Sequence, residues 1–439
     1  MTSKEFNQKY KLKIDNISSP FAFAPKNNNF INVAGKPKKL TIEIIKRFFK
    51  SWPSVLFLFI FLAVFITSIV VTAYSNYSAD ISVDQTTQLN LIGAKAGEKT
   101  NTGSSFVKSL PSIWQGKINS NLVFSDAYFT ENALVWQKQD YYGGYLWFEF
   151  NKPEYFTNDL SGNSIVRYID FYKWYEVDSV HIVLRNSGIN PNITYSEAAK
   201  YYQEILAANP HIKLNTYLGT NSAGIDIWTQ SWIGTWRAIR LALIVATLQT
   251  IIGVAIGSYL GFHVGKPADT IIMRLIDIFS APPTLIWLLL FATLFGTTDL
   301  TLGIALIFVG WVGSVGRTRL FIITVKDSEF ITASQSVGAS KARLIYKHAL
   351  PAIIGKIATN YVASIPSIIL SISSLAFLGF FQSDNANLGK IISSAPAEAA
   401  TNIWTLLLPS LILLSISVSL HFIALGVHDA LDPKVIKSK

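Results

Sequence analysis

The chain has 439 residues, of which half are hydrophobic and only 15% are charged, a composition that excludes most soluble globular classes and indicates an integral membrane protein. The formal net charge of +10 favours acidic partners, but the excess basic residues flank apolar segments, where membrane topology places them. We therefore expect membrane lipid, and no nucleic acid, among the partners. Because the sequence contains no cysteine, disulfides and thiolate metal sites are excluded.

Residues 1–53 combine a polar, basic tail with an amphipathic segment. Residues 1–38 are rich in Asn, Pro and Gly, which predicts a cytoplasmic tail. The next residues place apolar side chains at helical spacing between lysines, which predicts a helix at the membrane interface; these apolar residues are Leu40, Ile44, Ile45, Phe48, Phe49 and Trp52.

The first membrane span is predicted within residues 54–75. Val55–Tyr74 is an uncharged apolar run of about the ~20 residues that a helix needs to cross the hydrocarbon. A secretory signal peptide is the alternative, but this run starts far from Met1 and lacks a small-residue cleavage site. We therefore expect a transmembrane helix here.

Residues 76–233 are expected to form a folded extracytoplasmic domain of the α+β class. Acidic residues outnumber basic ones there, and the segment is long enough to fold independently. Its aromatic stretches Tyr145–Phe150 and Tyr168–Leu184 are typical of strands, whereas Ser196–Ala208 favours a helix.

Five further apolar segments follow in residues 234–428, and residues 429–439 form a C-terminal tail. The segments are predicted at about 241–262, 275–296, 301–316, 352–378 and 403–425. With six spans, nearly all basic residues of the short loops fall on one side of the membrane, so both termini are expected in the cytoplasm. The predicted fold is an all-α polytopic membrane protein of six transmembrane helices, with a large α+β insertion between the first and second.

A polar hairpin interrupts the apolar pattern at residues 327–350. Phe330, Ala333, Ser334 and Val337 share one face of a short helix, which is too small for a core. Gly338 ends that helix, and Ser340 can cap a return helix. The pattern predicts a soluble projection that another protein holds.

The spacing of Gly338, His348, Leu350 and Pro351 resembles the cytoplasmic loop of permease subunits in binding-protein-dependent ABC importers. That loop is written as Glu-Ala-Ala, then Gly, then Leu-Pro, and Thr332-Ala333-Ser334 stands here in place of Glu-Ala-Ala. Glu329 lies nearby and can supply the missing carboxylate. The resemblance is therefore partial at the start of the loop and complete in its later spacing.

Further motifs resemble the dipeptide and oligopeptide permeases in particular. They occur in the family's order over about residues 215–435: Leu218-Gly219-Thr220-Asn221 with Gly224 and Asp226, Met273-Arg274 with Asp277, Pro283-Thr284, Ser374 to Gly379, and Asp429 to Pro433. Ile225 replaces the usual Arg. Residues 76–213 have no counterpart of that size in the resemblance.

The resemblance implies the second, C-type permease subunit of an oligopeptide importer in the plasma membrane. The implied partners are a homologous permease, two ATPase subunits that bind ATP and Mg, and an extracytoplasmic peptide-binding protein or lipoprotein. The implied ATPase-coupling residues are Glu329, Phe330, Thr332, Ala333, Ser334, Val337, Gly338, His348, Leu350 and Pro351.

Two small-residue stripes run along the predicted spans. Asn360, Ser364, Ser367, Ser371 and Ser374 recur at intervals of four and three in the fifth span, which fits either a wet translocation path or tight helix packing. In the second span, Gly253, Gly257 and Gly261 form a doubled GxxxG, for which packing is the favoured interpretation.

Several sequence features are missing, and their absence narrows the range of possible functions. No GxxxxGK[ST] motif occurs, so ATP hydrolysis is expected in partner chains and this chain is not expected to be an enzyme. The spans lack Asp and Glu apart from Asp277, which disfavours a proton-driven transporter. The histidines are scattered, so neither a metal site nor a cofactor is expected.

The open alternatives are a membrane-anchored scaffold for an external binding domain, an export permease, and a permease for dipeptides or nickel.

Overall fold

The computed structural model describes residues 40–83, 109–120, 142–161, 164–190, 192–379 and 387–431. The chain divides into two units, Met1–Arg47 and Phe48–Lys439. The expected tail at residues 1–38 and the terminal residues 432–439 lie outside the described residues. Helix α2 (Leu40–Lys50) forms where the amphipathic spacing predicts it.

The described residues of the second unit contain five helices that are long and apolar enough to cross a membrane. They are α3 (Trp52–Tyr74), α9 (Ile227–Phe262), α12 (Asp299–Lys326), the continuous helical stretch Lys341–Phe377 that includes α15 (Leu350–Phe377), and α17 (Trp404–Leu431). The chain is thus a polytopic, mainly helical membrane protein. Helix α9 starts at Ile227, so the expected domain boundary at residue 233 falls inside this helix.

The predicted span at 275–296 is not a single helix. Helices α10 (Pro267–Ser280) and α11 (Thr284–Phe295) meet at a break with a bend of 75°. Pro282 and Pro283 lie at this break; neither has a backbone N–H to donate, so a continuous helix is disfavoured there. Counted as one broken span, the pair brings the total to six.

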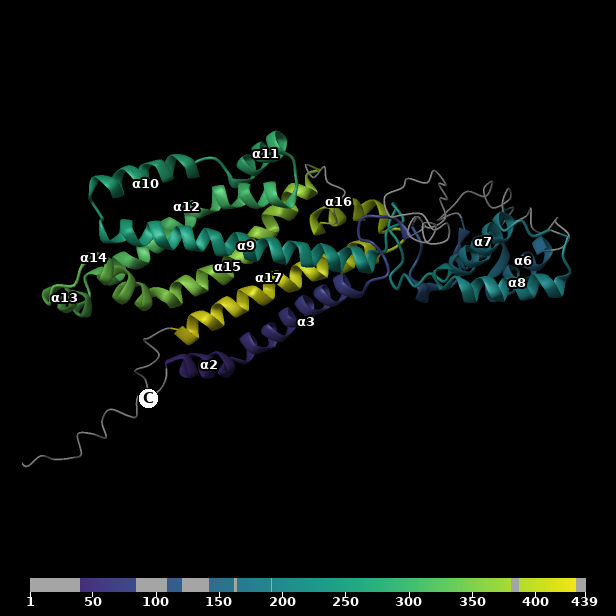
Figure 1. Cartoon of the computed structure of the whole chain (residues 1–439), viewed down its shortest axis with the longest axis horizontal. Helices are drawn as coiled ribbons and strands as arrows, with labels where there is room; N and C mark the ends of the chain where they lie inside the picture. The colour runs from purple at the N-terminus through teal and green to yellow at the C-terminus, as the bar shows by residue number, and fades with distance from the viewer. Residues whose placement is uncertain are drawn as a thin grey trace, which may run out of the picture. The chain divides into compact units, whose positions relative to one another are not determined.

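Helices α9 and α12 form the most extensive pair of the bundle, and they lie side by side in Figure 1. Gly253, Gly257 and Gly261 face α12: a Cβ on Gly257 would lie 2.6 Å from the carbonyl oxygen of Val315, and one on Gly261 would lie 2.6 Å from Cβ of Ile322. The packing interpretation of the glycine stripe is therefore confirmed.

Helices α15, α17 and α3 complete this bundle. Helix α15 packs on α17 and α9, and α17 packs on α3 (Figure 1). A short helix, α16 (Leu388–Glu398), lies against both α15 and α17. The buried core is mainly aliphatic and includes Ile239 and Val245 of α9, Leu375 of α15 and Ile416 of α17.

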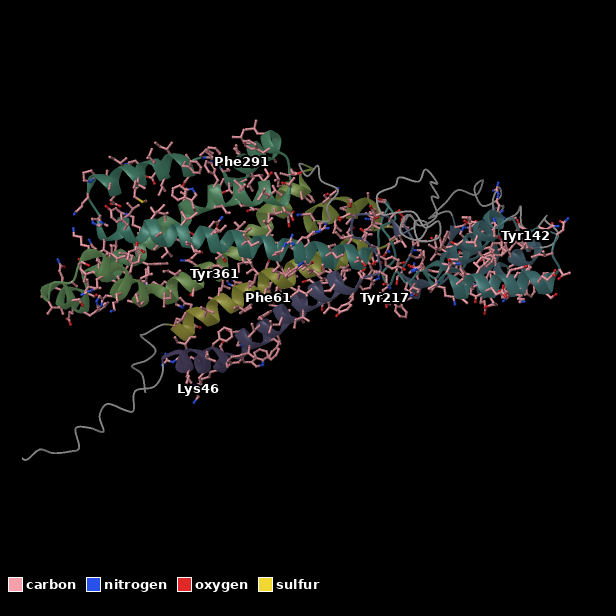
Figure 2. All side chains as sticks on the ribbon, viewed as in Figure 1. Lys46, Phe61, Tyr142, Tyr217, Phe291 and Tyr361 are labelled. Atoms are coloured by element: carbon pink, nitrogen blue, oxygen red, sulfur yellow. The ribbon has the colours of Figure 1, made fainter. Side chains whose placement is uncertain are left out.

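Residues 76–226 are here called the insert, and the described part of the insert forms a separate core from α6 (Tyr142–Phe150), α7 (Phe171–Asn186), α8 (Tyr195–Ala208) and a small sheet. Strands β1 (Ile118–Asn119), β2 (Phe156–Ser161) and β3 (Ser164–Ile169) are antiparallel in the order β1-β3-β2. Figure 2 shows Tyr142 within the insert and Tyr217 where the insert meets the apolar helices.

Two strand predictions in the insert are wrong, and one helix prediction is confirmed. Tyr145–Phe150 lies in α6, and most of Tyr168–Leu184 lies in α7. Aromatic residues favour strands, but the aromatic residues of α6 are buried at helical spacing. Helix α7 begins at a cap, because Asp170 accepts hydrogen bonds from the backbone N–H groups of Tyr172 and Lys173. The predicted helix Ser196–Ala208 is α8.

Candidate functional site

A polar cavity of about 270 Å³ lies between α9, α12 and α15. Its lining combines most of the Ser/Asn stripe with polar and apolar residues of the same and neighbouring helices: Gln249, Thr284, Leu306, Gly310, Arg317, Asn360, Ala363, Ser364, Ser367, Ile368 and Ser371. Four of the five stripe residues therefore meet in one place. Ser374 is exposed and does not line this cavity.

Gln249 forms one wall of the cavity and is fixed in place. Its Nε2 donates a hydrogen bond to the carbonyl oxygen of Leu306 across 2.7 Å, and its side chain is buried. Gly310 lies directly against this amide, where a Cβ would collide with it. The bond joins α9 to α12 beside the cavity, and the Gly310 position makes room for it.

Arg317 and Asn360 continue the polar lining toward one end. Both also line a second, smaller hollow with Thr250, Ser314 and Thr318. The hydroxyls of Ser364 and Ser371 donate to carbonyl oxygens of their own helix, at Tyr361 (2.8 Å) and Ser367 (2.9 Å). The cavity thus offers hydroxyl and amide groups and one guanidinium, a surface suited to hydrated polar molecules rather than to covalent chemistry.

The hairpin forms as its sequence predicts. Helix α13 (Glu329–Ser336) has its C-cap at Val337 and is followed by Gly338, whose φ of +84° lies in the left-handed region that glycine adopts without strain. The Ser340 hydroxyl then accepts a hydrogen bond from the backbone N–H of Arg343 and begins α14 (Lys341–Arg343). A π-helical segment, η6 (Leu344–Ala349), leads directly into α15.

The hairpin separates an attached face from an exposed one. Ile331 is buried in a cluster with Ile322, Leu344, Ala349 and Ile353, and this cluster fixes α13 to α12 and α15. By contrast, Phe330 is 47% exposed and Val337 86% exposed, and Ala333 beside them is also exposed. The exposed apolar surface formed by Phe330, Ala333 and Val337 is here called the hairpin surface.

The remaining hairpin residues surround the hairpin surface or continue the chain toward α15. Glu329, Thr332, Gly338 and Pro351 are exposed, whereas Ser334, His348 and Leu350 are half-buried. The Ser334 hydroxyl donates to the carbonyl oxygen of Phe330, and that of Thr332 donates to the carbonyl oxygen of Ser328. Neither hydroxyl needs a partner outside the chain.

Helix α15 connects the hairpin to the cavity. Its first turns pack against the cluster around Ile331, and its middle carries Asn360, Ser364 and Ser367. Since the helical stretch is continuous from Lys341 to Phe377, a displacement of the hairpin can be transmitted to the cavity wall.

Three residues of the cavity and the hairpin were not predicted from the sequence as site residues. Gln249 is an amide inside an otherwise apolar span, which is a usable signal. Arg317 lies one residue beyond the predicted end of the fourth span, whereas α12 extends to Lys326. Ile331 falls outside the chosen helical face, and only its contacts reveal its role.

Within the described ranges, no group of three or more His, Asp or Glu side chains is close enough to hold a metal ion. The cavity and the hairpin contain no such cluster of carboxylates or imidazoles.

Comparison with known proteins gives consistent results. Residues 253–437 match the family described as binding-protein-dependent transport system inner membrane component. The chain is 30% identical over 226 residues to the oligopeptide transport system permease protein OppC of Mycoplasma pneumoniae, covering 50% of this chain and 60% of that relative. It is also 30% identical to OppC of Bacillus subtilis over 222 residues, covering 50% and 72%, and to the dipeptide transport system permease protein DppC of the same organism over 221 residues, covering 50% and 69%.

Proposed function

The chain belongs to the family of binding-protein-dependent transport system inner membrane components, and we propose that it is a permease subunit of an ATP-driven importer of oligopeptides. The names of its relatives support peptide uptake, and one relative, named for dipeptides, keeps shorter peptides within the same substrate class. The chain itself carries no nucleotide-binding motif, so ATP and Mg bind to partner subunits.

The observation that carries this proposal is the hairpin surface. An apolar residue that is 86% exposed at the tip of a polar projection is unfavourable in water, and docking on a partner removes it from water. The opposite face of α13 is attached through Ile331 to α15. An ATPase subunit that binds Phe330, Ala333 and Val337 can therefore move α15, the helix that lines the cavity.

In this proposal the polar cavity is one half of the translocation path, and a homologous permease supplies the other half. Asn360, Ser364, Ser367 and Ser371 offer hydrogen-bonding groups to a hydrated peptide backbone, and Gln249 and Arg317 add an amide and a cation. Ser374, further along the helix, extends the stripe beyond the cavity.

We assign the hairpin to the cytoplasm. Lys326, Lys341, Arg343 and Lys347 on or next to the hairpin support this side, because basic residues concentrate in short cytoplasmic loops. By parity over six spans both termini are cytoplasmic too, and the insert is an extracytoplasmic domain within residues 76–233. A peptide-binding protein or lipoprotein docks on that side.

Peptide uptake into vesicles tests the proposal. The complete complex, with both permeases, both ATPases and the binding protein, is reconstituted, and accumulation of a labelled oligopeptide is measured with and without ATP. Val337→Asp is expected to lower ATP-dependent uptake at least tenfold and to weaken ATPase association, because it places a charge at the hairpin surface. Gln335→Asp is the matched control, since Gln335 is exposed on the same helix outside that surface.

Gly338→Arg is expected to abolish uptake while leaving the chain in the membrane. The added side chain has open space, so the defect would come from the left-handed backbone and the altered docking surface. Normal uptake by both Val337→Asp and Gly338→Arg would contradict the docking role. Uptake of dipeptides in preference to longer peptides would instead reassign the substrate.

A further inference from the structure

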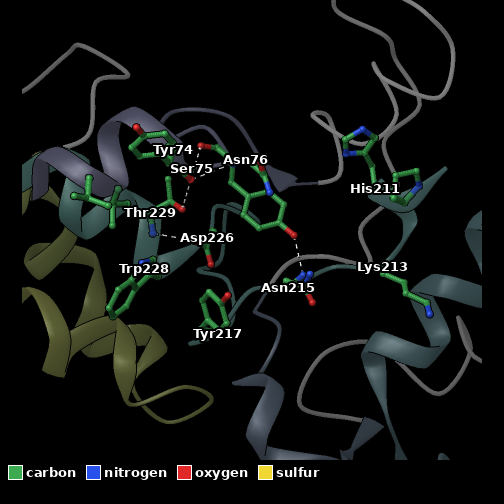
Figure 3. A pocket seen from close by; sticks show the side chains of 14 residues that line it. Tyr74, Ser75, Asn76, His211, Lys213, Asn215, Tyr217, Asp226, Trp228 and Thr229 are labelled. Carbon is green, nitrogen blue, oxygen red and sulfur yellow. Dashed lines mark hydrogen bonds between the residues drawn. The ribbon is translucent and has the colours of Figure 1, made fainter. Parts of the chain in front are cut away.

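A second cavity, of about 550 Å³, lies where the end of α3 and the start of α9 meet the insert (Figure 3). It shares no lining residue with the cavity beside α15. Its walls come from Val70–Tyr77, from the segment Pro210–Tyr217 of the insert, and from Asp226–Thr229. We call it the junction pocket.

One carboxylate oxygen at the junction pocket has no hydrogen-bond donor. Asp226 is 2% exposed, and its Oδ2 accepts a hydrogen bond from the backbone N–H of Thr229 across 2.8 Å, which caps α9. Its Oδ1 is buried and receives none. Burial raises the pKa of this carboxyl to about 6. A buried acceptor without a donor is costly, so a donor that reaches this oxygen from the pocket would be stabilising.

Aromatic side chains form part of the same pocket. Tyr74, Tyr77, Tyr217 and Trp228 line the pocket, and the rings of Tyr217 and Trp228 meet edge to face with centroids 6.4 Å apart. The Tyr77 hydroxyl accepts a hydrogen bond from the backbone N–H of Asn215 across 2.8 Å, which fixes that ring. Aromatic faces attract cations, and a carboxylate among them adds a full opposite charge.

The opposite side of the pocket is basic. Figure 3 shows His211 and Lys213 across the pocket from Trp228 and Asp226. The pocket therefore separates an end that attracts a cation from an end that attracts an anion.

We propose that the junction pocket binds a primary ammonium group, which donates a hydrogen bond to Oδ1 of Asp226 and lies among the aromatic rings. A quaternary ammonium has the charge but no N–H, so it cannot satisfy this oxygen. Two sources share this chemistry: the amino terminus of a peptide, and the ethanolamine headgroup of a phospholipid. Either would place an anionic group toward Lys213. The proposal does not depend on the transport function.

Binding to the full chain in phosphatidylcholine nanodiscs tests both sources. In the peptide arm, equilibrium dialysis compares labelled trialanine with N-acetyl-trialanine. In the lipid arm, the discs contain phosphatidylethanolamine or its N-acylated derivative, and native mass spectrometry measures the lipid retained on the chain. The free amine is expected to bind at least tenfold more tightly than the blocked one in one of the two arms.

The key variant is Asp226→Asn, which keeps a residue that caps helices well and so preserves the start of α9. This variant is expected to weaken binding of the free amine at least tenfold. Tyr217→Leu, at a half-exposed position in the pocket wall, is expected to weaken the same binding severalfold. Asp299→Asn is the matched control, because Asp299 is an exposed carboxylate that pairs with Arg240 away from the pocket. Equal binding of free and blocked amines in both arms, or unchanged binding by a folded Asp226→Asn chain, would overturn the proposal.

Discussion

The side-chain amide of Asn402 donates a hydrogen bond to the backbone carbonyl oxygen of Leu218 across 2.6 Å. The same nitrogen lies 3.2 Å from the carbonyl oxygen of Leu110, and the Asn402 side chain is buried. These contacts join the segment between α16 and α17 to two distant parts of the insert. The insert is therefore hydrogen-bonded to the helix bundle as well as connected to it by the chain.

Asn402→Leu should loosen this junction. The substitution removes both donated hydrogen bonds, one of them to the buried carbonyl oxygen of Leu110, so the free energy of unfolding is expected to fall by about 1–3 kcal/mol. Thermal unfolding in detergent and protease sensitivity of the insert measure the effect. Asn192→Leu, at an exposed position in the insert, serves as control and should change neither measurement. Equal stability of the two variants would mean that the junction contributes little.

Gly257→Ala should destabilise the contact between α9 and α12. The new Cβ would lie 2.6 Å from the Val315 carbonyl oxygen, and relieving such overpacking typically costs about 1–3 kcal/mol. Gly316→Ala is the matched control in α12, where no atom lies within 4 Å of an added Cβ. We expect it to be neutral or slightly stabilising, since Ala favours helices over Gly. Denaturation by sodium dodecyl sulfate compares the two, and equal effects would contradict close packing at Gly257.

Ser367→Trp should block transport without unfolding the chain. Ser367 lines the polar cavity, whereas Ser374 lies on the same helix outside it, and both side chains are exposed. An indole at position 367 would fill much of the cavity, so peptide uptake by the assembled complex should fall at least tenfold. Ser374→Trp should retain most uptake. If both variants transport normally, the cavity is not on the path.

Stability should depend on pH through Asp226. Its folded-state pKa of about 6 lies above the usual value of 3.8, so the folded chain binds more protons between these values. The protonated Asp226 carboxyl therefore contributes about 3 kcal/mol to the free energy of unfolding below about pH 4. This contribution is lost as the pH rises through about 6. His211 and Lys213 line the same pocket and add their own charges.

Comparing wild type with Asp226→Asn isolates the carboxyl contribution. The decrease in the free energy of unfolding from pH 4 to pH 7 should be about 3 kcal/mol smaller in the variant than in the wild type. In infrared spectra, the band of a protonated carboxyl should titrate near pH 6 in the wild type alone. A titration midpoint near 4 would show that the carboxyl is solvated.

The sequence predicted the hairpin well because its signals are local. Gly338 and Ser340 determine the turn through backbone conformation and a side-chain cap, and neither depends on distant contacts. The strand predictions for the segments that form α6 and α7 were wrong, because they rested on aromatic content rather than on the spacing of the apolar residues. Tyr142, Leu146 and Phe150 are buried at intervals of four residues, and Tyr145 is buried three residues after Tyr142, which is a helical pattern.

The candidate site was predictable only in part. The Ser/Asn stripe follows from the 3.6-residue period of a single helix, and four of its members do line one cavity. That Gln249 and Arg317 join them depends on how three helices pack. The outward position of Phe330 and Val337, with Ile331 turned inward, likewise depends on the contacts of α13 with its neighbours.

The sequence alone determined the membrane class, the approximate spans, the hairpin and the family, because hydrophobicity, helical period and turn residues act over short stretches of chain. Tertiary structure decided the composition of the polar cavity, the outward position of Phe330 and Val337, and the unpaired oxygen of Asp226. These features depend on which residues distant in sequence exclude water from one another, and local patterns do not specify those contacts.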